Sequence, residues 1–309
     1  MKIKNKLYTV LACFLILILL AGLGAFKPKI ANGKSDSSGE NTEAKSTTDT
    51  GTKKIKKIGG ISSRMPENSA LVFFGSTFGL KLTSYKGYKN FDEALLALRS
   101  GETDAVWACD VSADYLLKIN EDLAKVDAEI SADIQKTEDA RFSFGMALKK
   151  DSGESLKDKI NGAISDMKTD GTLAGLISTY IDNAEYYETE QGKEARFYPD
   201  KMRNNGKDGT ITVGITGAVP PLELLDEDME PYGFCVALMD EIGARIGKKV
   251  KFLYIENETA FTSLMSGRVN VIFSYGTGRI TTEYKQNFIM TDGYYEMGRY
   301  DLISLRSTQ

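Results

Sequence analysis

The sequence contains no histidine, only three cysteines and a single tryptophan among 309 residues. The absence of histidine excludes catalytic triads with an imidazole base, and it also excludes metal sites and pH switches built from histidine. Neither sign of charge dominates, because 39 basic residues face 43 acidic ones and the net charge is -4. This balance argues against a dedicated nucleic-acid-binding protein.

What is present has the composition of an ordinary globular chain, with 42% hydrophobic and 27% charged residues. Such fractions are typical of folded domains rather than of disordered or fibrous proteins. At about 150 residues per domain, the length allows two domains that are each large enough for a core of their own.

Residues 7–26 form an uncharged apolar run, LYTVLACFLILILLAGLGAF, which follows lysines at positions 2, 4 and 6. About twenty apolar residues can span a bilayer as a helix, and the preceding lysines favour a cytoplasmic N-terminus. We therefore expect residues 1–26 to be a signal peptide or membrane anchor and the rest of the chain to be exported. The run is long for a signal peptide and a good cleavage site is missing, so an uncleaved anchor is favoured over a cleaved signal.

Residues 27–59 are expected to be a disordered tether. Positions 34–52 contain no large apolar side chain and cannot contribute to a hydrophobic core. The short basic run KKIKK at 53–57 could lie against anionic lipid, but four lysines attract a screened surface only weakly. A solvated basic run is the favoured interpretation.

Cysteine contributes little to the expected fold. Apart from Cys13 in the apolar run, the chain has Cys109 and Cys235, each within an apolar stretch where a buried thiol is the usual outcome. A single long-range disulfide formed after export is the less favoured alternative.

From residue 60 onward, strand-like and helix-like segments alternate, which indicates an α/β architecture. We expect strands at 71–74, 105–109, 211–215, 250–255 and 269–273. One helix is predicted to begin after an Asn90 N-cap with Glu93 as its reciprocal partner, and to end at Gly101. Further helices are predicted at 234–246, closed by Gly247, and between Asn257 and Gly267.

One pattern occurs twice. Residues 98–106 read LRSGETDAV and residues 264–272 read LMSGRVNVI, so each combines a helix end, a glycine cap, a short polar turn and an apolar strand. Glycine is common wherever a helix leads into a strand, but the shared L-x-S-G-x-x-[DN] spacing goes beyond that preference. The repeat predicts two similar α/β lobes.

The second half of the chain resembles the first lobe of the type 2 extracytoplasmic solute-binding proteins, in the polar amino-acid-binding branch of ABC importers. The resemblance is carried by TITVGIT from Thr210, the Pro220–Pro221 turn, GFCVALMDEIG from Gly233 and FIMTDGYY from Phe288. Residues 91–110 are similar to the second lobe of this family, and 144–149 with 156–174 to its closing segments. The resemblance implies an α/β, two-lobed periplasmic-binding-protein-like (type 2) fold with a ligand cleft between the lobes, behind an N-terminal membrane helix.

The two lobes stand in the reverse of the family's order. The expected organisation is a second-lobe-like region with the closing helices at 60–182, a connector at 183–208 and a first-lobe-like region at 209–309. Circular permutation is favoured over a damaged tandem, in which two copies of the protein each lost one lobe, because one complete set of the family's segments is present. It makes 142–149 and 299–306 the two hinge strands, which are expected to run side by side between the lobes.

The resemblance also implies the ligand-binding residues. Asp110 falls where the family places the carboxylate that receives the α-amino group of an amino acid. The family binds the ligand carboxylate with an arginine, and counting from Ser274 to Phe288 puts Thr282 at that position. Arg279, three residues earlier, is therefore the candidate for a bidentate clamp, with a surface arginine as the alternative.

Ser274 and Thr277 are predicted to be supporting donors to the ligand. Ser76 and Thr77, following the strand expected at 71–74, are predicted to offer backbone N–H groups to an anion. At three positions the chain departs from the family pattern, because Val219 and Leu222 replace aromatic residues and Cys235 replaces an acidic one. These departures leave the identity of the ligand open.

The function implied by the resemblance is capture of a small amino-acid-like solute for an ABC permease at the outer face of the cytoplasmic membrane. The protein would be tethered there or secreted, and neither a cofactor, a metal nor a nucleic acid is implied. A membrane-tethered ligand sensor or a degenerate non-transport binding module is the alternative. A dehydratase or lyase on this fold is less favoured, because no paired acid and base stand out.

Overall fold

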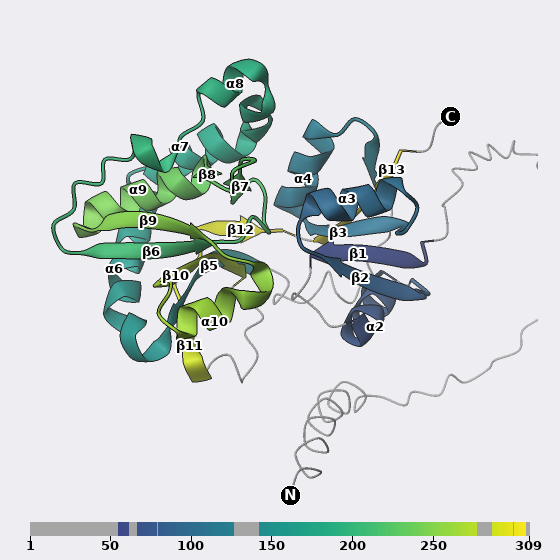
Figure 1. The fold of residues 1–309 in the computed structure, drawn as a ribbon, viewed down its shortest axis with the longest axis horizontal. Coiled ribbons are helices and arrows are strands. Elements are labelled where there is room, and N and C mark those ends of the chain that lie inside the picture. The colour runs from purple at the N-terminus through teal and green to yellow at the C-terminus, as the bar shows by residue number, and fades with distance from the viewer. Residues whose placement is uncertain are drawn as a thin grey trace, which may run out of the picture. The chain divides into compact units, whose positions relative to one another are not determined.

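A computed structural model describes residues 55–61, 67–78, 80–126, 142–276, 286–298 and 300–306 (Figure 1). The chain divides into compact units at 1–52 and 53–309, and every described residue belongs to the second unit. The anchor predicted at 1–26 lies outside the described residues, as does most of the tether predicted at 27–59. Within the described ranges, no helix is both long enough and apolar enough to cross a bilayer.

The first sheet has five strands in the order β2-β1-β3-β13-β4. Its first three strands in sequence are parallel to one another, whereas β13 runs antiparallel to both β3 and β4. The strands are β1 (Lys57–Ile61), β2 (Ser84–Tyr88), β3 (Ala105–Cys109), β4 (Leu123–Lys125) and β13 (Tyr300–Leu305). The accompanying helices are α2 (Glu67–Phe78), α3 (Phe91–Arg99) and α4 (Asp110–Ile119). We call this part lobe A.

The second sheet has the order β11-β5-β10-β6-β9, with β12 pairing additionally with β5. Its strands are β5 (Phe142–Lys149), β6 (Thr210–Ile215), β9 (Lys249–Tyr254), β10 (Val271–Gly276), β11 (Phe288–Met290) and β12 (Tyr295–Met297). Its main helices are α6 (Lys150–Thr169), α7 (Thr172–Ile177), α9 (Phe234–Ile246) and α10 (Ala260–Met265), and a small hairpin pairs β7 (Leu224–Leu225) with β8 (Pro231–Tyr232). We call this part lobe B.

Several short helices link the closing helices of lobe B to β6. They are the π-helix η2 (Ser178–Asp182), the 3-10 helix η3 (Ala184–Glu188), α8 (Glu190–Glu194) and the 3-10 helix η4 (Pro199–Lys201). A further 3-10 helix, η5 (Asn257–Thr259), precedes α10.

The two sheets share one topology. In each lobe, three parallel strands form a βαβαβ unit, and a fourth strand of the sheet comes next in the chain. In the sheet, an antiparallel strand from elsewhere in the chain lies between the third strand and the fourth. Lobe B receives β5 in this position and lobe A receives β13. The chain therefore passes from lobe A to lobe B between residues 126 and 142, and returns between Met297 and Tyr300. This confirms the two similar α/β lobes that the repeated sequence pattern predicts.

The prediction that 142–149 and 299–306 run side by side as hinge strands is wrong. β5 pairs with β10, β11 and β12, whereas β13 pairs with β3 and β4. Each strand is the first element after a passage between the lobes, and its backbone hydrogen bonds lie within one sheet.

Most of the local predictions hold. Asn90 caps α3 by accepting a hydrogen bond of 2.9 Å from the amide of Glu93, although the Glu93 carboxylate reaches the amide of Lys89 rather than that of Asn90. α9 ends as predicted at Gly247, whose φ of 73° is a left-handed conformation that glycine adopts readily.

The strand predicted at 71–74 is wrong, because these residues lie within helix α2. The place of the first strand is taken by β1, the only part of this region that pairs with both β2 and β3 among the described strands. A short apolar run suits a buried helix as well as a strand. In the helix, Ala70 and Phe74 are buried, and Phe74 packs against Tyr85 and Trp107.

Candidate functional site

Asp110 lies at the carboxyl end of β3 and is the first residue of α4. Its Oδ1 accepts a hydrogen bond of 2.8 Å from the amide of Val111, and its Oδ2 accepts one of 2.7 Å from the amide of Gly298. Gly298 belongs to the passage that returns from lobe B to lobe A. The predicted ammonium receptor is therefore a partly buried carboxylate that joins the end of a lobe A strand to this passage.

Tyr295 of β12 places a phenol close to this carboxylate. Burial raises the pKa of Tyr295 to about 12, and the negative charge of Asp110 adds to the shift. A neutral phenol can donate one hydrogen bond and accept others. The charge of the Asp110 carboxylate therefore acts on a tyrosine hydroxyl that stays protonated at neutral pH.

Ser274 is buried inside lobe B, with 5% of its surface exposed. It has a left-handed φ of 47° and sits where the pairing of β10 with β5 shifts register. Its hydroxyl lies 2.8 Å from the hydroxyl of Tyr294, whose ring stacks on Phe273. Ser274 therefore contacts Tyr294, and the next residue in the chain, Tyr295, is the tyrosine that the charge of Asp110 affects.

The other predicted ligand contacts fall elsewhere. Ser76 and Thr77 lie in the last turn of α2, so the loop expected after a strand at this point is helical. Within a helix, backbone N–H groups are directed to carbonyls four residues earlier, which is why such a segment does not form an anion-binding loop. Thr277 and Arg279 lie outside the described residues, as does Thr282.

Glu223 holds a loop of lobe B in place, a role that is not predicted from the sequence. Only 1% of its surface is exposed, and its Oε2 accepts hydrogen bonds from the Thr216 hydroxyl and from the amides of Thr216 and Gly217 at 2.8–3.0 Å. These bonds fix the loop that leaves β6 and leads to the cis Pro220–Pro221 peptide. A glutamate within the apolar stretch PPLELL is the sequence signal that could have indicated it.

The two positions where the family pattern has aromatic residues, Val219 and Leu222, do not line a surface in this structure. Val219 and Leu222, on either side of the proline pair, are buried in the hydrophobic core of lobe B. Cys235, also in that core, is fully buried, and burial together with the Glu223 charge raises the pKa of its thiol. Cys109 and Cys235 are both free thiols, which confirms the favoured interpretation of these cysteines.

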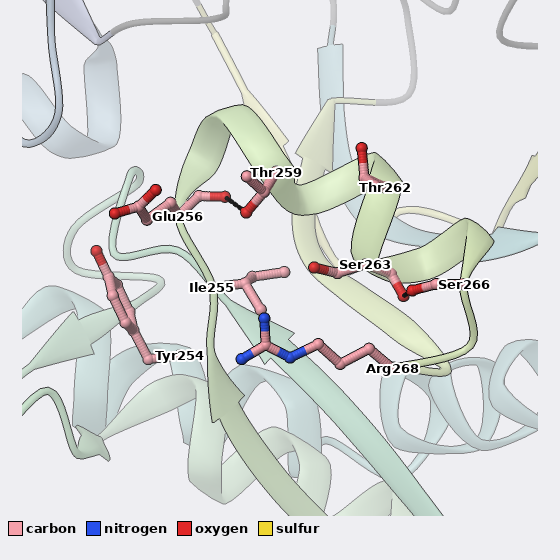
Figure 2. A pocket seen from close by; sticks show the side chains of 8 residues that line it. All are labelled: Tyr254, Ile255, Glu256, Thr259, Thr262, Ser263, Ser266 and Arg268. Atoms are coloured by element: carbon pink, nitrogen blue, oxygen red, sulfur yellow. Dashed lines mark hydrogen bonds between the residues drawn. The ribbon is translucent and has the colours of Figure 1, made fainter.

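A separate groove of about 520 Å³ lies entirely within lobe B (Figure 2). Figure 2 shows the Arg268 side chain extending toward Ile255, with hydroxyl-bearing residues of the α10 region above it and Tyr254 at the far end. The groove is lined by Tyr254, Ile255, Glu256, Thr259, Thr262, Ser263, Ser266 and Arg268. Neither Asp110 nor Ser274, the two predicted ligand-binding residues whose side chains the structure describes, lines it.

Among the side chains that the structure describes, no group of three Cys, Asp or Glu residues is arranged to hold a metal ion. A carboxylate beside a neutral phenol provides an acceptor for an ammonium group and a hydroxyl for a second polar group.

Residues 211–308 match the family model described as bacterial extracellular solute-binding proteins, family 3. The chain is similar to the type 2 extracytoplasmic solute-binding proteins. This match begins with β6 and runs through lobe B into β13, so it covers the region in which the sequence resemblance to the family's first lobe was found. No curated protein matches the chain in sequence.

One similar solved structure is the ligand-binding component of an ABC-type import system from Staphylococcus aureus, which is 10% identical to this chain with a TM-score of 0.39. The alignment covers 82% of this chain and 66% of that one. The periplasmic domain of BvgS from B. pertussis is 12% identical with a TM-score of 0.38, covering 83% of this chain and 38% of that one. An arginine-bound mutant of ArgBP from T. maritima is 12% identical with a TM-score of 0.39, covering 81% and 87%. The chain thus spans less than two thirds of the first two structures.

Proposed function

We propose that the protein is an extracytoplasmic solute-binding protein that captures a small amino-acid-like ligand between its two lobes for an ABC permease. The observation that carries the proposal is the position of Asp110, whose carboxylate stands at the end of a lobe A strand and binds the passage that returns from lobe B. The family match over 211–308 and the shared topology of the two sheets support the same function.

Binding at this place couples the ligand to the arrangement of the lobes. An ammonium group that approaches Asp110 shares the carboxylate with the Gly298 amide, so the ligand acts on the segment that connects the lobes. A ligand shifts a conformational equilibrium only through contacts that differ between its states. Arg279 and Thr277 are proposed to bind the ligand carboxylate, and Ser274 supports the site by fixing Tyr294.

The proposal places the protein at the outer face of the cytoplasmic membrane, held there by residues 1–26 or released after cleavage. Its partners are a small polar solute and a permease, and its role is binding rather than catalysis. It uses neither a cofactor nor a metal, and no nucleic acid is involved.

The order of the lobes belongs to the same proposal. Circular permutation assigns 60–182 to the family's second lobe with the closing helices, 183–208 to a connector and 209–309 to the first lobe. The shared sheet topology supports this assignment, because each lobe borrows one strand from the other half. The hinge strands that the assignment predicts side by side, 142–149 and 299–306, instead pair within different sheets. Exchanging the order of two such lobes leaves the set of strand pairings intact.

A thermal-shift series with the twenty amino acids, carried out on the full chain in detergent, tests the proposed function. A ligand at a hundred times its dissociation constant should raise the melting temperature by about 5 to 10 °C. Asp110→Asn should abolish this shift, whereas Asp92→Asn, at an exposed position in the first turn of α3, should leave it intact. If no amino acid stabilises the protein, or if Asp110→Asn responds like the wild type, the proposed function fails.

A further inference from the structure

The segment between η2 and β6 contacts both lobes. On one side, Ala184 and Tyr187 of η3 are buried in the same hydrophobic cluster as Tyr115 and Leu116 of α4, in lobe A. On the other side, the carbonyl of Phe197 accepts a hydrogen bond of 3.0 Å from the amide of Gly233, at the start of α9 in lobe B. This segment is therefore a third connection between the lobes, in addition to the two passages of the chain.

The centre of this connection is the carboxylate of Glu188. Its Oε1 accepts hydrogen bonds from the Tyr115 hydroxyl at 2.9 Å and the Tyr232 hydroxyl at 2.6 Å, and its Oε2 accepts one from Arg196 at 3.0 Å. Tyr115 belongs to lobe A and Tyr232 to lobe B. One side chain of the segment thus holds a hydroxyl from each lobe, and we call these four residues the latch cluster.

The latch cluster is largely buried, although 29% of the Glu188 side chain remains exposed. Arg196 has 8% of its surface exposed, and its guanidinium lies over the Tyr232 ring at 4.1 Å from the ring centre. Burial, with the charge of Glu188, raises the pKa of both Tyr115 and Tyr232, so both hydroxyls remain donors across the whole neutral range. Hydrogen bonds to an ionised group are stronger than neutral ones, and a buried charge that loses its partners is costly.

A second contact lies on the same face of α4. Lys118, three residues after Tyr115 and therefore on the same side of the helix, donates hydrogen bonds to the carbonyl of Asp182 at 2.8 Å and to Glu185 at 3.0 Å. This pair is exposed, so its own contribution is small. It extends the area over which α4 contacts the segment between η2 and β6.

We propose that the latch cluster fixes the relative orientation of the two lobes in the absence of ligand. Glu188 and its two tyrosines then limit how far lobe A can separate from lobe B along this side. Movement of the lobes has to pivot about the latch cluster or break the bond between Tyr115 and Glu188. This role is independent of the ligand and would hold for a transporter component or a sensor.

The test measures the distance between the lobes by electron–electron double resonance on the full chain in detergent, without ligand. Spin labels are attached at Leu96→Cys on α3, where 69% of the side chain is exposed, and at Lys159→Cys on α6, in a Cys13→Ser background. Cys109 and Cys235 are buried and are left in place. The intact latch cluster should give one narrow distance distribution.

Tyr115→Phe removes only the hydroxyl that lobe A contributes and keeps the ring in the core. It should raise the population with separated lobes about tenfold, which corresponds to the loss of one hydrogen bond to a charged group. Glu188→Ala should broaden the distribution further. Tyr186→Phe, which alters an exposed ring on the same turn, is the matched control and should leave the distribution unchanged.

Unfolding of Tyr115→Phe is monitored by circular dichroism, and its retained phenyl ring makes a loss of fold unexpected. An unchanged distance distribution in both Tyr115→Phe and Glu188→Ala would overturn the proposal. Because no ligand is added, this result does not depend on whether Asp110 binds an amino acid.

Discussion

Asp110 and Gly298 are 188 residues apart in the chain, yet the Asp110 carboxylate accepts a hydrogen bond of 2.7 Å from the Gly298 amide. The approach is close enough that a Cβ atom on residue 298 would lie 2.9 Å from Oδ2 of Asp110. A side chain at position 298 would therefore displace the carboxylate and lengthen the bond. The absence of a side chain at Gly298 is a condition for this contact between the end of β3 and the passage to β13.

Gly298→Ala should lower the free energy of unfolding by about 1 to 2 kcal/mol, because the displaced carboxylate loses a charge-assisted hydrogen bond. The same variant should weaken binding of any amino acid that stabilises the wild type, since the carboxylate no longer occupies its place. Urea denaturation and a thermal-shift titration measure the two effects. Gly175→Ala, on α7 with open space around the new methyl group, is the control that should show neither loss.

Glu223→Gln should reduce the free energy of unfolding by about 2 to 3 kcal/mol, because the carboxylate that holds the loop after β6 loses its charge. The three hydrogen bonds to Oε2 involve Thr216 and Gly217, so the loop should also exchange its amide hydrogens faster. Denaturation curves and hydrogen exchange provide the measurements. Glu227→Gln, four residues later and exposed, should behave like the wild type; an equal effect from both variants would contradict the prediction.

Two glycines of α6 should respond to alanine in opposite directions. Gly162 has open space where a Cβ would lie, so Gly162→Ala should stabilise the protein by about 0.5 to 1 kcal/mol through helix propensity. A Cβ on Gly153 would lie 2.9 Å from the Cβ of Leu148, so Gly153→Ala should destabilise it by about 1 to 3 kcal/mol. Thermal unfolding of both variants gives the direction of each change in melting temperature. Changes in the same direction would be incompatible with this packing.

Alkaline pH should destabilise the protein between about pH 10 and 12. The pKa of Tyr295 is raised to about 12 from its ordinary 10.0, and burial also raises the pKa of Tyr294 well above its ordinary value. The unfolded chain therefore releases these protons first, and the stabilisation that is complete below pH 10 is lost as the pH rises toward the folded-state value. The urea concentration at the midpoint of unfolding, measured as a function of pH, should decrease across this pH window.

The contribution of one residue to this pH dependence can be isolated. Tyr295→Phe should make the decline less steep, because it removes one of the groups that ionise only on unfolding. Tyr186→Phe, at an exposed ring, should leave the slope unchanged. A slope that is the same in wild type and Tyr295→Phe would contradict the assignment.

The sequence predicts those parts of the fold that depend on neighbours along the chain. The Asn90 cap of α3 and the Gly247 end of α9 involve residues within one or two turns, and both are found as expected. The repeated glycine turns correctly indicate two similar lobes, since Gly101 and Gly267 both adopt left-handed conformations at helix ends.

What could not be predicted depends on distant partners. The run LVFF at 71–74 is apolar enough for a helix or a strand, and only the pairing of β1 with β2 and β3 decides that it is helical. Likewise, nothing near β5 or β13 indicates which sheet each strand joins. At the candidate site, the position of Asp110 follows from the end of β3, but its bond to Gly298 requires the complete fold.

The location of β13 has a consequence for the order in which the two lobes can complete their folding during synthesis. β13 fills the gap between β3 and β4, so lobe A remains an open sheet until residues 300–305 have emerged, although its other strands are made first. Until then, β3 presents an unpaired edge that could associate with another chain. Lobe B, by contrast, has β5 available before its own parallel strands. The lobe that is translated first is therefore the one that finishes folding last.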